Sequence, residues 1–219
     1  TNELFSNKQF GFIKGRSTTL QLLKVLDSWT EYLESGGQID VIYTDLEKAF
    51  DKVPHKRLIS KLRSYKINED VIAWIQAFLE NRKQRVHING KYSQWASVLS
   101  GIPQGSILGP LLFIIYINDL VEACNNGSTI FLYADDAKIF KHILTETDKI
   151  ALQKDLDSAC TWTERWLLKL NVNKCKFVSY GRNYDYQANY TLHDTNLERL
   201  ENFKDLGVLF DSKLKFGEH

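Results

Sequence analysis

Apolar residues recur along this chain with helical spacing in several segments. In residues 18–35 they run from Leu22 to Leu33 until Gly36 and Gly37 end the pattern, which predicts a helix with one buried face. Thr18 and Gln21, three positions apart, fit a capping box at its start. Further helices are predicted at residues 55–65, 69–81, 110–120 and 145–168, with Asn68 capping the second and a Thr145 and Asp148 capping box opening the last.

The spacing within the two middle helices also predicts which side chains face the core. These are Leu58, Ile59, Leu62 and Tyr65 in residues 55–65, and Val71, Trp74, Ile75, Phe78 and Leu79 in residues 69–81.

Short runs of β-branched and aromatic residues predict strands. Residues 39–45 are almost continuously apolar, which is typical of a central strand buried on both faces. Residues 128–133 and 137–140 predict a hairpin with Asp135 and Asp136 at its tip. A second hairpin is predicted from residues 84–88 and 92–98 around Asn89 and Gly90, and later strands are expected at 175–180, 196–203 and 206–210, after a linker at 183–187.

Composition limits the class of protein without identifying it. With 219 residues, 43% of them hydrophobic, the chain can bury one large core or two small ones. A net charge of +1 gives no overall signal for nucleic acid, so such a signal has to be local. The longest apolar run, residues 107–117, is much shorter than the roughly 20 residues that span a bilayer. No secretory signal precedes Thr1. We expect a chain that begins with Thr1, not Met, to be a piece of a longer protein.

The cysteines predict a reducing compartment. Cys124, Cys160 and Cys175 are odd in number and lack CxxC spacing, which argues against a disulfide framework or a zinc site and favours buried thiols.

Two adjacent carboxylates, Asp135 and Asp136, lie between the strands of the first predicted hairpin. Asp is a common turn residue, so an ordinary turn is the simpler interpretation. However, two neighbouring negative charges repel, and a divalent cation would offset that cost. Asp45 ends the central strand and is either a third ligand at the same edge of the sheet or a cap for the next turn.

Cations gather in two places. Lys14 and Arg16 lie in a glycine-containing loop, where they either grip phosphates or are merely solvated. The second group, on the predicted outer faces of two helices and just beyond them, is typical of a surface that follows a phosphate backbone, although a solvated surface is the ordinary alternative. It comprises Lys56, Arg57, Lys61, Arg63, Lys66, Arg82, Lys83 and Arg85.

Residues 100–110 predict a rigid loop. They contain three glycines and two prolines, which suits close approach of a ligand to the backbone, and Pro110 is acceptable only in the first turn of the following helix. The Gln104 amide and free backbone N–H groups there could hold a sugar or a phosphate.

Several motifs together resemble the palm of a reverse transcriptase. In order they are TDLEKAFD with Asp45, SGIPQGSILGP with Gln104, YADD with Asp135 and Asp136, residues 170–176, and Leu206-Gly207. The sequences KAFDKVPH, WIQAFLENRKQRV and QGSILGPLLFIIYINDL are similar to those of the non-LTR, LINE-type reverse transcriptases related to jockey elements. The resemblance extends from residue 9 to residue 211.

The resemblance implies RNA-directed DNA synthesis with two Mg²⁺ ions, Mn²⁺ being a possible substitute. Asp45 and Asp135 would bind both ions, Asp136 would assist the ion that activates the primer 3′-hydroxyl, and Lys174 or Lys176, of which we select Lys174, would protonate pyrophosphate.

The resemblance also assigns nucleotide-binding positions. Phe50 matches the aromatic gate against ribonucleotides, with an ordinary core phenylalanine as the alternative, and Gln104 and Gly105 lie beside the incoming sugar. Lys14 and Arg16 match the fingers contacts to the triphosphate, Arg16 being the better match because a guanidinium suits phosphate oxygens. Leu206 and Gly207 match the primer grip.

The implied architecture is α+β, with an antiparallel palm sheet backed by helices. Fingers are expected at 1–37 and 56–99, palm at 38–55 and 100–180, and the end of the palm with the primer-grip hairpin at 181–219, with no thumb. Implied partners are an RNA template, a DNA primer, dNTPs and the endonuclease and thumb of a longer polyprotein. The resemblance also implies that the protein acts in the nucleus and cytoplasm and has no membrane as a partner. The alternatives are a group II intron maturase, a telomerase or a retron enzyme, and an inactive remnant that only binds RNA.

Overall fold

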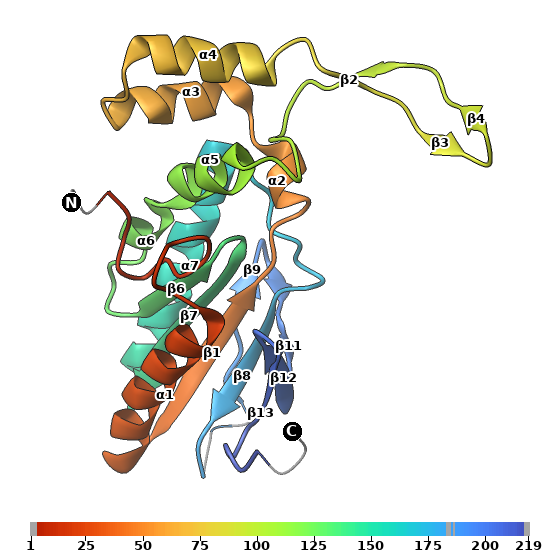
Figure 1. Cartoon of the computed structure of the whole chain (residues 1–219). Coiled ribbons are helices and arrows are strands. Elements are labelled where there is room, and N and C mark those ends of the chain that lie inside the picture. The colour runs from red at the N-terminus through yellow and green to blue at the C-terminus, as the bar shows by residue number, and fades with distance from the viewer. Residues whose placement is uncertain (1–3, 183–184, 186, 217–219) are drawn as a thin grey trace.

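A five-stranded sheet forms the centre of the protein (Figure 1). The computed structural model describes residues 4–182, 185 and 187–216. In the sheet the strand order is β11-β8-β1-β7-β6, and only β11 runs parallel to its neighbour. The strands are β1 (Gln38–Thr44), β6 (Thr129–Tyr133), β7 (Asp136–Ile143), β8 (Lys176–Tyr180) and β11 (Glu198–Arg199). The predicted central strand and the predicted antiparallel hairpin are therefore confirmed.

Strand β1 is buried along its whole length, as its apolar sequence predicts. Its one carboxylate, Asp40, is fully buried and accepts hydrogen bonds from the Tyr190 hydroxyl at 2.5 Å and the Gln38 amide at 2.8 Å. Burial raises the pKa of Asp40, and these donors partly offset the shift. The buried polar group is thus satisfied within the fold.

Two long helices cover the opposite faces of the sheet: α1 (Thr18–Glu34) and α7 (Glu146–Trp166) (Figure 1). Alternate side chains of β1 point to opposite faces. Ile39, Val41 and Tyr43 share a core with Trp29 of α1. Ile42 belongs to the core that contains α7. The sheet is therefore held between two separate apolar layers.

The predicted N-terminal caps are correct for helix α7 and wrong for helix α1. The Thr145 and Asp148 capping box of α7 is confirmed. At α1, however, the cap is Ser17, whose hydroxyl accepts a hydrogen bond from the Leu20 N–H at 3.2 Å, and Thr18 is the first helical residue. Both residues are good caps, and the backbone of Ser17 is the extended one that a cap requires.

A pair of antiparallel helices, α3 (His55–Ser64) and α4 (Glu69–Leu79), lies beyond one end of the sheet (Figure 1). Asn68 caps α4, as predicted. The inward assignment of Val71 and Trp74 is wrong, because these side chains are 46% and 59% exposed and Ile72 is buried instead. Helix α4 packs on one side only, which narrows its buried stripe.

The prediction that Lys61 of α3 lies on the outer, cationic face of the helix is also wrong. It is buried, pairs with Asp119 and donates to the Tyr116 carbonyl. Burial lowers the pKa of Lys61 to about 8.

Three short helices connect these layers: α2 (Ala49–Lys52), α5 (Leu108–Ile117) and α6 (Leu120–Ala123). Pro110 lies in the first turn of α5, where no intrahelical N–H is needed. Helix α5 is buried on nearly all sides.

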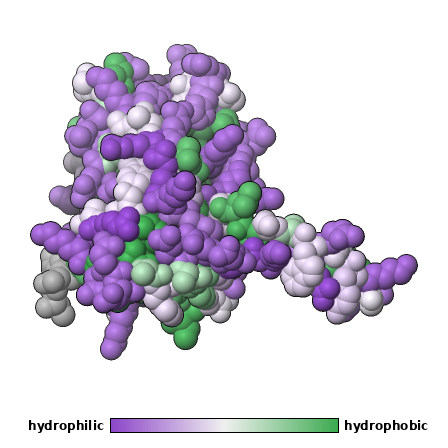
Figure 2. Space-filling view, turned by 90° about the horizontal axis from the view of Figure 1, so that it is seen from above, coloured by the Kyte–Doolittle hydropathy of each residue, from purple (hydrophilic) through white to green (hydrophobic). Residues whose placement is uncertain are grey.

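Residues 82–99 form an arm that projects from the body (Figures 1 and 2). Its short strands are β2 (Lys83–Gln84), β3 (His87–Ile88), β4 (Lys91–Tyr92) and β5 (Ala96–Ser97). The predicted hairpin is confirmed with an interruption: β3 pairs with β4 around Asn89 and Gly90, and β2 pairs with β5. All four strands are exposed.

The C-terminal part contains two small hairpins. Their strands are β9 (Thr191–Leu192) with β10 (Thr195–Asn196), and β12 (Asn202–Asp205) with β13 (Val208–Asp211). The strand predicted at 206–210 is present as β13 but begins two residues later, because Leu206 and Gly207 form a turn with positive φ. The prediction of one strand over 196–203 is wrong, because these residues are divided among β10, β11 and β12. Of the predicted linker 183–187, residues 183, 184 and 186 lie outside the described residues.

Two expectations from composition can be compared with the fold. Cys160 and Cys175 are buried thiols, Cys124 is half-buried, and all three are free. Within residues 4–182, 185 and 187–216, no helix has the length and apolarity needed to cross a membrane.

Candidate active site

Three carboxylates gather at one end of the central strands. Thr44, the last residue of β1, pairs with Ala137, so one further step along the same register places Asp45 opposite Asp136. Asp136 begins β7 and pairs with Tyr133 of β6. Asp135 lies in the turn between the two strands, after Ala134 with its positive φ of 55°. The tip is thus Ala134 and Asp135, one residue earlier than predicted, and the predicted convergence with Asp45 is found.

A segment near the N-terminus holds this turn in place, which sequence reasoning missed. Gln9 is fully buried, and its side-chain oxygen accepts hydrogen bonds from the N–H groups of Ala134 at 3.1 Å and Gly11 at 2.7 Å. A Cβ atom on Gly11 would lie 2.3 Å from the Ala134 nitrogen, so only glycine fits against the turn. The only sequence signal was a glycine within an apolar stretch.

The electrostatics of the three carboxylates favour a bound cation. Loss of water around the group, followed by the charges of Asp135, Asp205 and Asp45, raises the pKa of Asp136 to about 6. Burial and the charge of Asp45 also raise the pKa of Asp135. One oxygen of Asp45, Oδ2, is buried without a hydrogen-bond partner. A carboxylate oxygen without a hydrogen-bond partner, with two further carboxylates beside it, is a suitable ligand for a hard divalent ion such as Mg²⁺.

This charge pattern predicts a pH-dependent response to Mg²⁺. Because the folded-state pKa of Asp136 is raised, its stabilising contribution is present below about pH 4 and is lost as the pH rises through about 6. We expect added Mg²⁺ to raise the thermal midpoint more at pH 7.5 than at pH 5, and Asp136→Asn to reduce that difference. Differential scanning fluorimetry measures it, and an equal rise at both pH values would contradict the assignment.

Of the two lysines implied by the resemblance, Lys174 reaches the carboxylates. Its Nζ lies 3.6 Å from Asp45 Oδ1. Lys176 instead pairs with Glu198 at 2.7 Å. The backbone of this segment is tied to the same aspartate, because the Asn171 N–H donates to the Asp45 carbonyl at 2.8 Å.

Phe50 and Gln104 lie on two segments that are hydrogen-bonded to each other through the Ile102 N–H and the Phe50 carbonyl at 2.8 Å. The ring of Phe50 stacks on Phe113 of α5 with a centroid distance of 4.4 Å, and Phe12 contacts it edge-on at 6.4 Å. The Gln104 amide donates to Asp51 Oδ1 at 3.0 Å. Gly105, with a φ of 79°, forms the turn that follows Gln104.

The two N-terminal cations differ in how they are engaged. Arg16 donates to the carbonyl oxygens of Ser6 and Gln9, so its guanidinium braces the segment that supports the carboxylate turn. Lys14 is exposed, and no hydrogen bond or ion pair joins it to another described residue. Of the two, Lys14 is therefore the cation available to a ligand.

The Leu206-Gly207 turn is joined to the carboxylate hairpin by a buried ion pair. Lys138 of β7 is 4% exposed, Asp205 of β12 is 6% exposed, and their side chains are hydrogen-bonded. The same small hairpin stacks Phe203 on Tyr43 of β1 with a centroid distance of 3.7 Å. Lys138 and Asp205 were not predicted, although a lysine two residues after Asp136 in an apolar strand was a visible signal.

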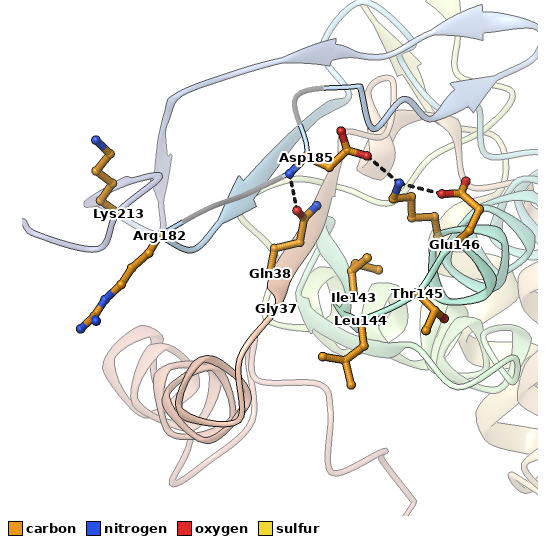
Figure 3. Close-up of a pocket in the computed structure, with 10 residues that line it drawn as sticks. Gly37, Gln38, Ile143, Leu144, Thr145, Glu146, Arg182, Asp185 and Lys213 are labelled. Atoms are coloured by element: carbon orange, nitrogen blue, oxygen red, sulfur yellow. Dashed lines mark hydrogen bonds and ion pairs between the residues drawn. The ribbon is translucent and has the colours of Figure 1, made fainter.

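The cavities differ in how close they lie to the carboxylates. One of 660 Å³ lies at the opposite end of β1, beside Gly37 and Gln38 (Figure 3). In it Lys149 pairs with Asp185 and Glu146, each at 2.7 Å. A smaller cavity of 90 Å³ adjoins the carboxylates and is lined by Asp136, Lys138, Asp205 and Leu206.

Solved structures show what class of fold this is. The chain is similar to telomerase from Candida tropicalis with a TM-score of 0.61 and 13% identity, over 97% of this chain and 34% of that one. It is also similar to telomerase from Candida albicans with a TM-score of 0.65 and 11% identity, over 93% of this chain and 34% of that one. Both structures are complexes with the TWJ fragment of telomeric RNA. The fold is the α+β fingers-and-palm fold of a reverse transcriptase.

The family follows from the sequence match. The model described as reverse transcriptase (RNA-dependent DNA polymerase) matches residues 1–210, and the chain belongs to this family. Two relatives are RNA-directed DNA polymerases from the mobile element jockey, of Drosophila melanogaster at 30% identity and Drosophila funebris at 31%, each over 96% of this chain. The chain spans 24% of the length of each. The resemblance to the jockey-related branch is confirmed.

Proposed function

We propose that this chain is the polymerase core of a non-LTR retrotransposon reverse transcriptase, which adds dNTPs to a primer 3′-hydroxyl on an RNA template. The observation that carries the proposal is the meeting of Asp45, Asp135 and Asp136 at one end of the sheet in a chain of this family. In each addition the primer 3′-hydroxyl loses its proton to solvent and its oxygen forms a bond to the α-phosphorus. The bond from that phosphorus to the bridging oxygen breaks, and pyrophosphate leaves.

Two Mg²⁺ ions, or Mn²⁺ in their place, are the proposed cofactors. Asp45 and Asp135 would hold both, and Asp136 would assist one; the unpartnered Asp45 Oδ2 and the raised pKa values of Asp135 and Asp136 support this. When bound, such ions lower the pKa of the primer hydroxyl and offset the charge of the triphosphate. The protein's part is to hold the three carboxylates at the ends of rigid strands.

The other residues would position the nucleotide and handle the leaving group. Lys174 would give a proton to pyrophosphate, and its distance of 3.6 Å from Asp45 supports this role. Lys14 would contact the triphosphate, and Arg16 would act mainly by bracing the loop that carries it. Gln104 and Gly105 would lie along the sugar, and Leu206 and Gly207 would hold the primer end.

We further propose fingers at residues 1–37 and 56–99, palm at 38–55 and 100–180, and the palm end with its primer grip at 181–219. Basic residues and no acidic ones occur in the arm, residues 82–99, which supports contact between the fingers and an RNA template. The endonuclease and thumb of the longer polyprotein and a DNA primer are the other proposed partners. Action in the nucleus and cytoplasm stays a prediction.

Phe50 provides a prediction about sugar selection. We expect Phe50→Val to raise incorporation of ribonucleotides relative to deoxyribonucleotides at least about tenfold, because a smaller side chain leaves room for a 2′-hydroxyl. Single-nucleotide incorporation kinetics with dTTP and UTP measure the ratio. Phe12→Val, which alters a 56% exposed ring in contact with Phe50, is the matched control. An unchanged ratio would make Phe50 an ordinary packing residue.

The activity is tested by dTMP incorporation on poly-A primed with oligo-dT, with Mg²⁺, with Mn²⁺ and with EDTA. The proposal predicts incorporation that requires the primer, the template and a divalent ion. Poly-A binding in a filter assay without any incorporation would instead support the inactive RNA-binding remnant, and equal incorporation with EDTA would exclude the proposed chemistry.

A further inference from the structure

Three potential metal ligands meet where the C-terminal part of α7 contacts the β9–β10 hairpin. Cys160 and Glu164 are four residues apart on α7 and therefore lie on the same helix face. His193 comes from a distant part of the sequence, the two-residue turn between β9 and β10. Two hydrogen bonds of 2.9 Å between Gln153 and the backbone of Thr191 fasten that hairpin to α7. The fold thus brings a thiol, a carboxylate and an imidazole together.

The distances between these groups suit a small tetrahedral ion. His193 Nδ1 lies 3.7 Å from Cys160 Sγ and 3.6 Å from Glu164 Oε1, and the three ligand atoms all lie within 4.8 Å of one another. Zinc bonds of about 2.0–2.3 Å at tetrahedral angles place neighbouring ligand atoms about 3.4–3.6 Å apart. Small rotations of the two partly exposed side chains, Glu164 and His193, suffice to close the site.

We propose that Cys160, Glu164 and His193 form a binding site for Zn²⁺ between α7 and the β9–β10 hairpin. The set of ligands selects the metal: thiolate and imidazole favour Zn²⁺ over Mg²⁺ or Mn²⁺, which prefer oxygen alone. On binding, the thiol of Cys160 loses its proton to solvent and its sulfur forms the bond to the metal. This site does not depend on the polymerase proposal and uses none of its residues.

The surroundings leave the fourth coordination position open. A cavity of 520 Å³ adjoins the site and is lined by Glu164, His193 and residues 167–170. A water molecule or a small anion can therefore complete the tetrahedron from the solvent side. Cys160 is only 9% exposed, so the buried sulfur anchors the ion from within while the other two ligands close over it.

A bound ion would cross-link the β9–β10 hairpin to α7. That hairpin follows Tyr190, which is buried and donates its hydroxyl to Asp40 of the central strand. A metal ion that binds only the folded state stabilises that state, and the stabilisation grows with the logarithm of the free metal concentration once this exceeds the dissociation constant. We therefore expect Zn²⁺ to raise the thermal midpoint, and the rise to depend on each of the three ligands.

The experiment titrates the reduced protein with Zn²⁺ by isothermal calorimetry and with Co²⁺ by absorbance, both in excess Mg²⁺. The proposal predicts one equivalent bound, with a thiolate-to-cobalt charge-transfer band. Cys160→Ala should abolish the band, and Glu164→Gln and His193→Gln should weaken Zn²⁺ binding at least about tenfold. Cys124→Ala is the matched control, because Cys124 is a half-buried free thiol that contacts the Asp155 carbonyl of α7 and is not one of the three ligands.

Two outcomes would overturn the proposal. One is the absence of a Zn²⁺ equivalent in excess Mg²⁺. The other is binding that Cys160→Ala and Cys124→Ala leave equally intact, which would assign the metal to other residues. A circular dichroism spectrum of each variant shows whether lost binding reflects lost fold.

Discussion

Asp135→Asn should reduce RNA-templated dTMP incorporation by about a thousandfold or more while leaving the protein at least as stable as before. Asparagine keeps the shape of the turn between β6 and β7 but removes the negative charge needed to hold a divalent ion. Lewis-acid stabilisation of several kcal/mol corresponds to roughly three orders of magnitude in rate. Steady-state incorporation on poly-A and oligo-dT measures the loss.

The stability half of this prediction follows from the electrostatics. Burial and the charge of Asp45 raise the pKa of Asp135, so in the absence of metal the ionised group opposes folding. A neutral amide relieves that repulsion. The thermal midpoint in EDTA at pH 7.5 should therefore stay the same or rise. A large loss of stability would show that Asp135 supports the fold.

Asp148→Asn is the matched control and should behave in the opposite way. The Asp148 carboxylate closes the capping box of α7 and accepts hydrogen bonds from the Thr145 N–H at 2.9 Å and the Leu144 N–H at 3.2 Å. Weakening this cap should cost about 0.5–1 kcal/mol of unfolding free energy. Incorporation per folded molecule should not change, because α7 lies behind the sheet. Loss of activity in both variants alike would contradict a special role for Asp135.

Lys138→Met should destabilise the protein by about 3–5 kcal/mol, the largest stability effect we expect from a single substitution. Lys138 and Asp205 are 4% and 6% exposed. Removing the lysine leaves the Asp205 charge buried and unpaired, and such groups are expensive to bury. Asp205 also helps to raise the pKa of Asp136, whereas Lys138 lowers it, so the loss should be greater at pH 7.5 than at pH 5. Urea unfolding at the two pH values measures both effects.

The double variant Lys138→Met with Asp205→Leu separates the ion pair from simple packing. Replacing both partners with apolar side chains of similar size removes the unpaired charge, so most of the lost stability should return. The β12–β13 hairpin, which Phe203 also anchors through Tyr43, should then remain docked. If the double variant is less stable than Lys138→Met, the ion pair is not the source of the effect.

The elements that the sequence predicted well are those whose signal is local. The apolar run that became β1 could only be a central strand, and the YADD hairpin and the α7 capping box depend on neighbours a few residues apart. The inward assignment of Val71 and Trp74 failed because the number of sides on which α4 packs is a tertiary property. Lys61 was misplaced because its partner, Asp119, is distant in sequence.

In the candidate site, too, the features with a local sequence signal were predicted and those that depend on distant residues were not. Motif order predicted which carboxylates belong together, and the strand register then brings Asp45 opposite Asp136. The supports of the site were not predictable. Gln9, which fastens the Ala134 turn, and Asp205, which pairs with Lys138, lie 125 and 67 residues from their partners. No spacing rule connects such positions, and the same holds for His193 and Cys160.

The central claim is that Asp45 and the Asp135-Asp136 pair hold divalent ions jointly. Electron paramagnetic resonance can count the Mn²⁺ bound to the protein in the presence of dTTP, with Zn²⁺ present at one equivalent to fill any thiolate site. The wild-type protein should bind Mn²⁺, and Asp45→Asn and Asp135→Asn should each weaken that binding at least about tenfold, a change of ~1.4 kcal/mol. Mn²⁺ binding that is the same in all three proteins would contradict the account.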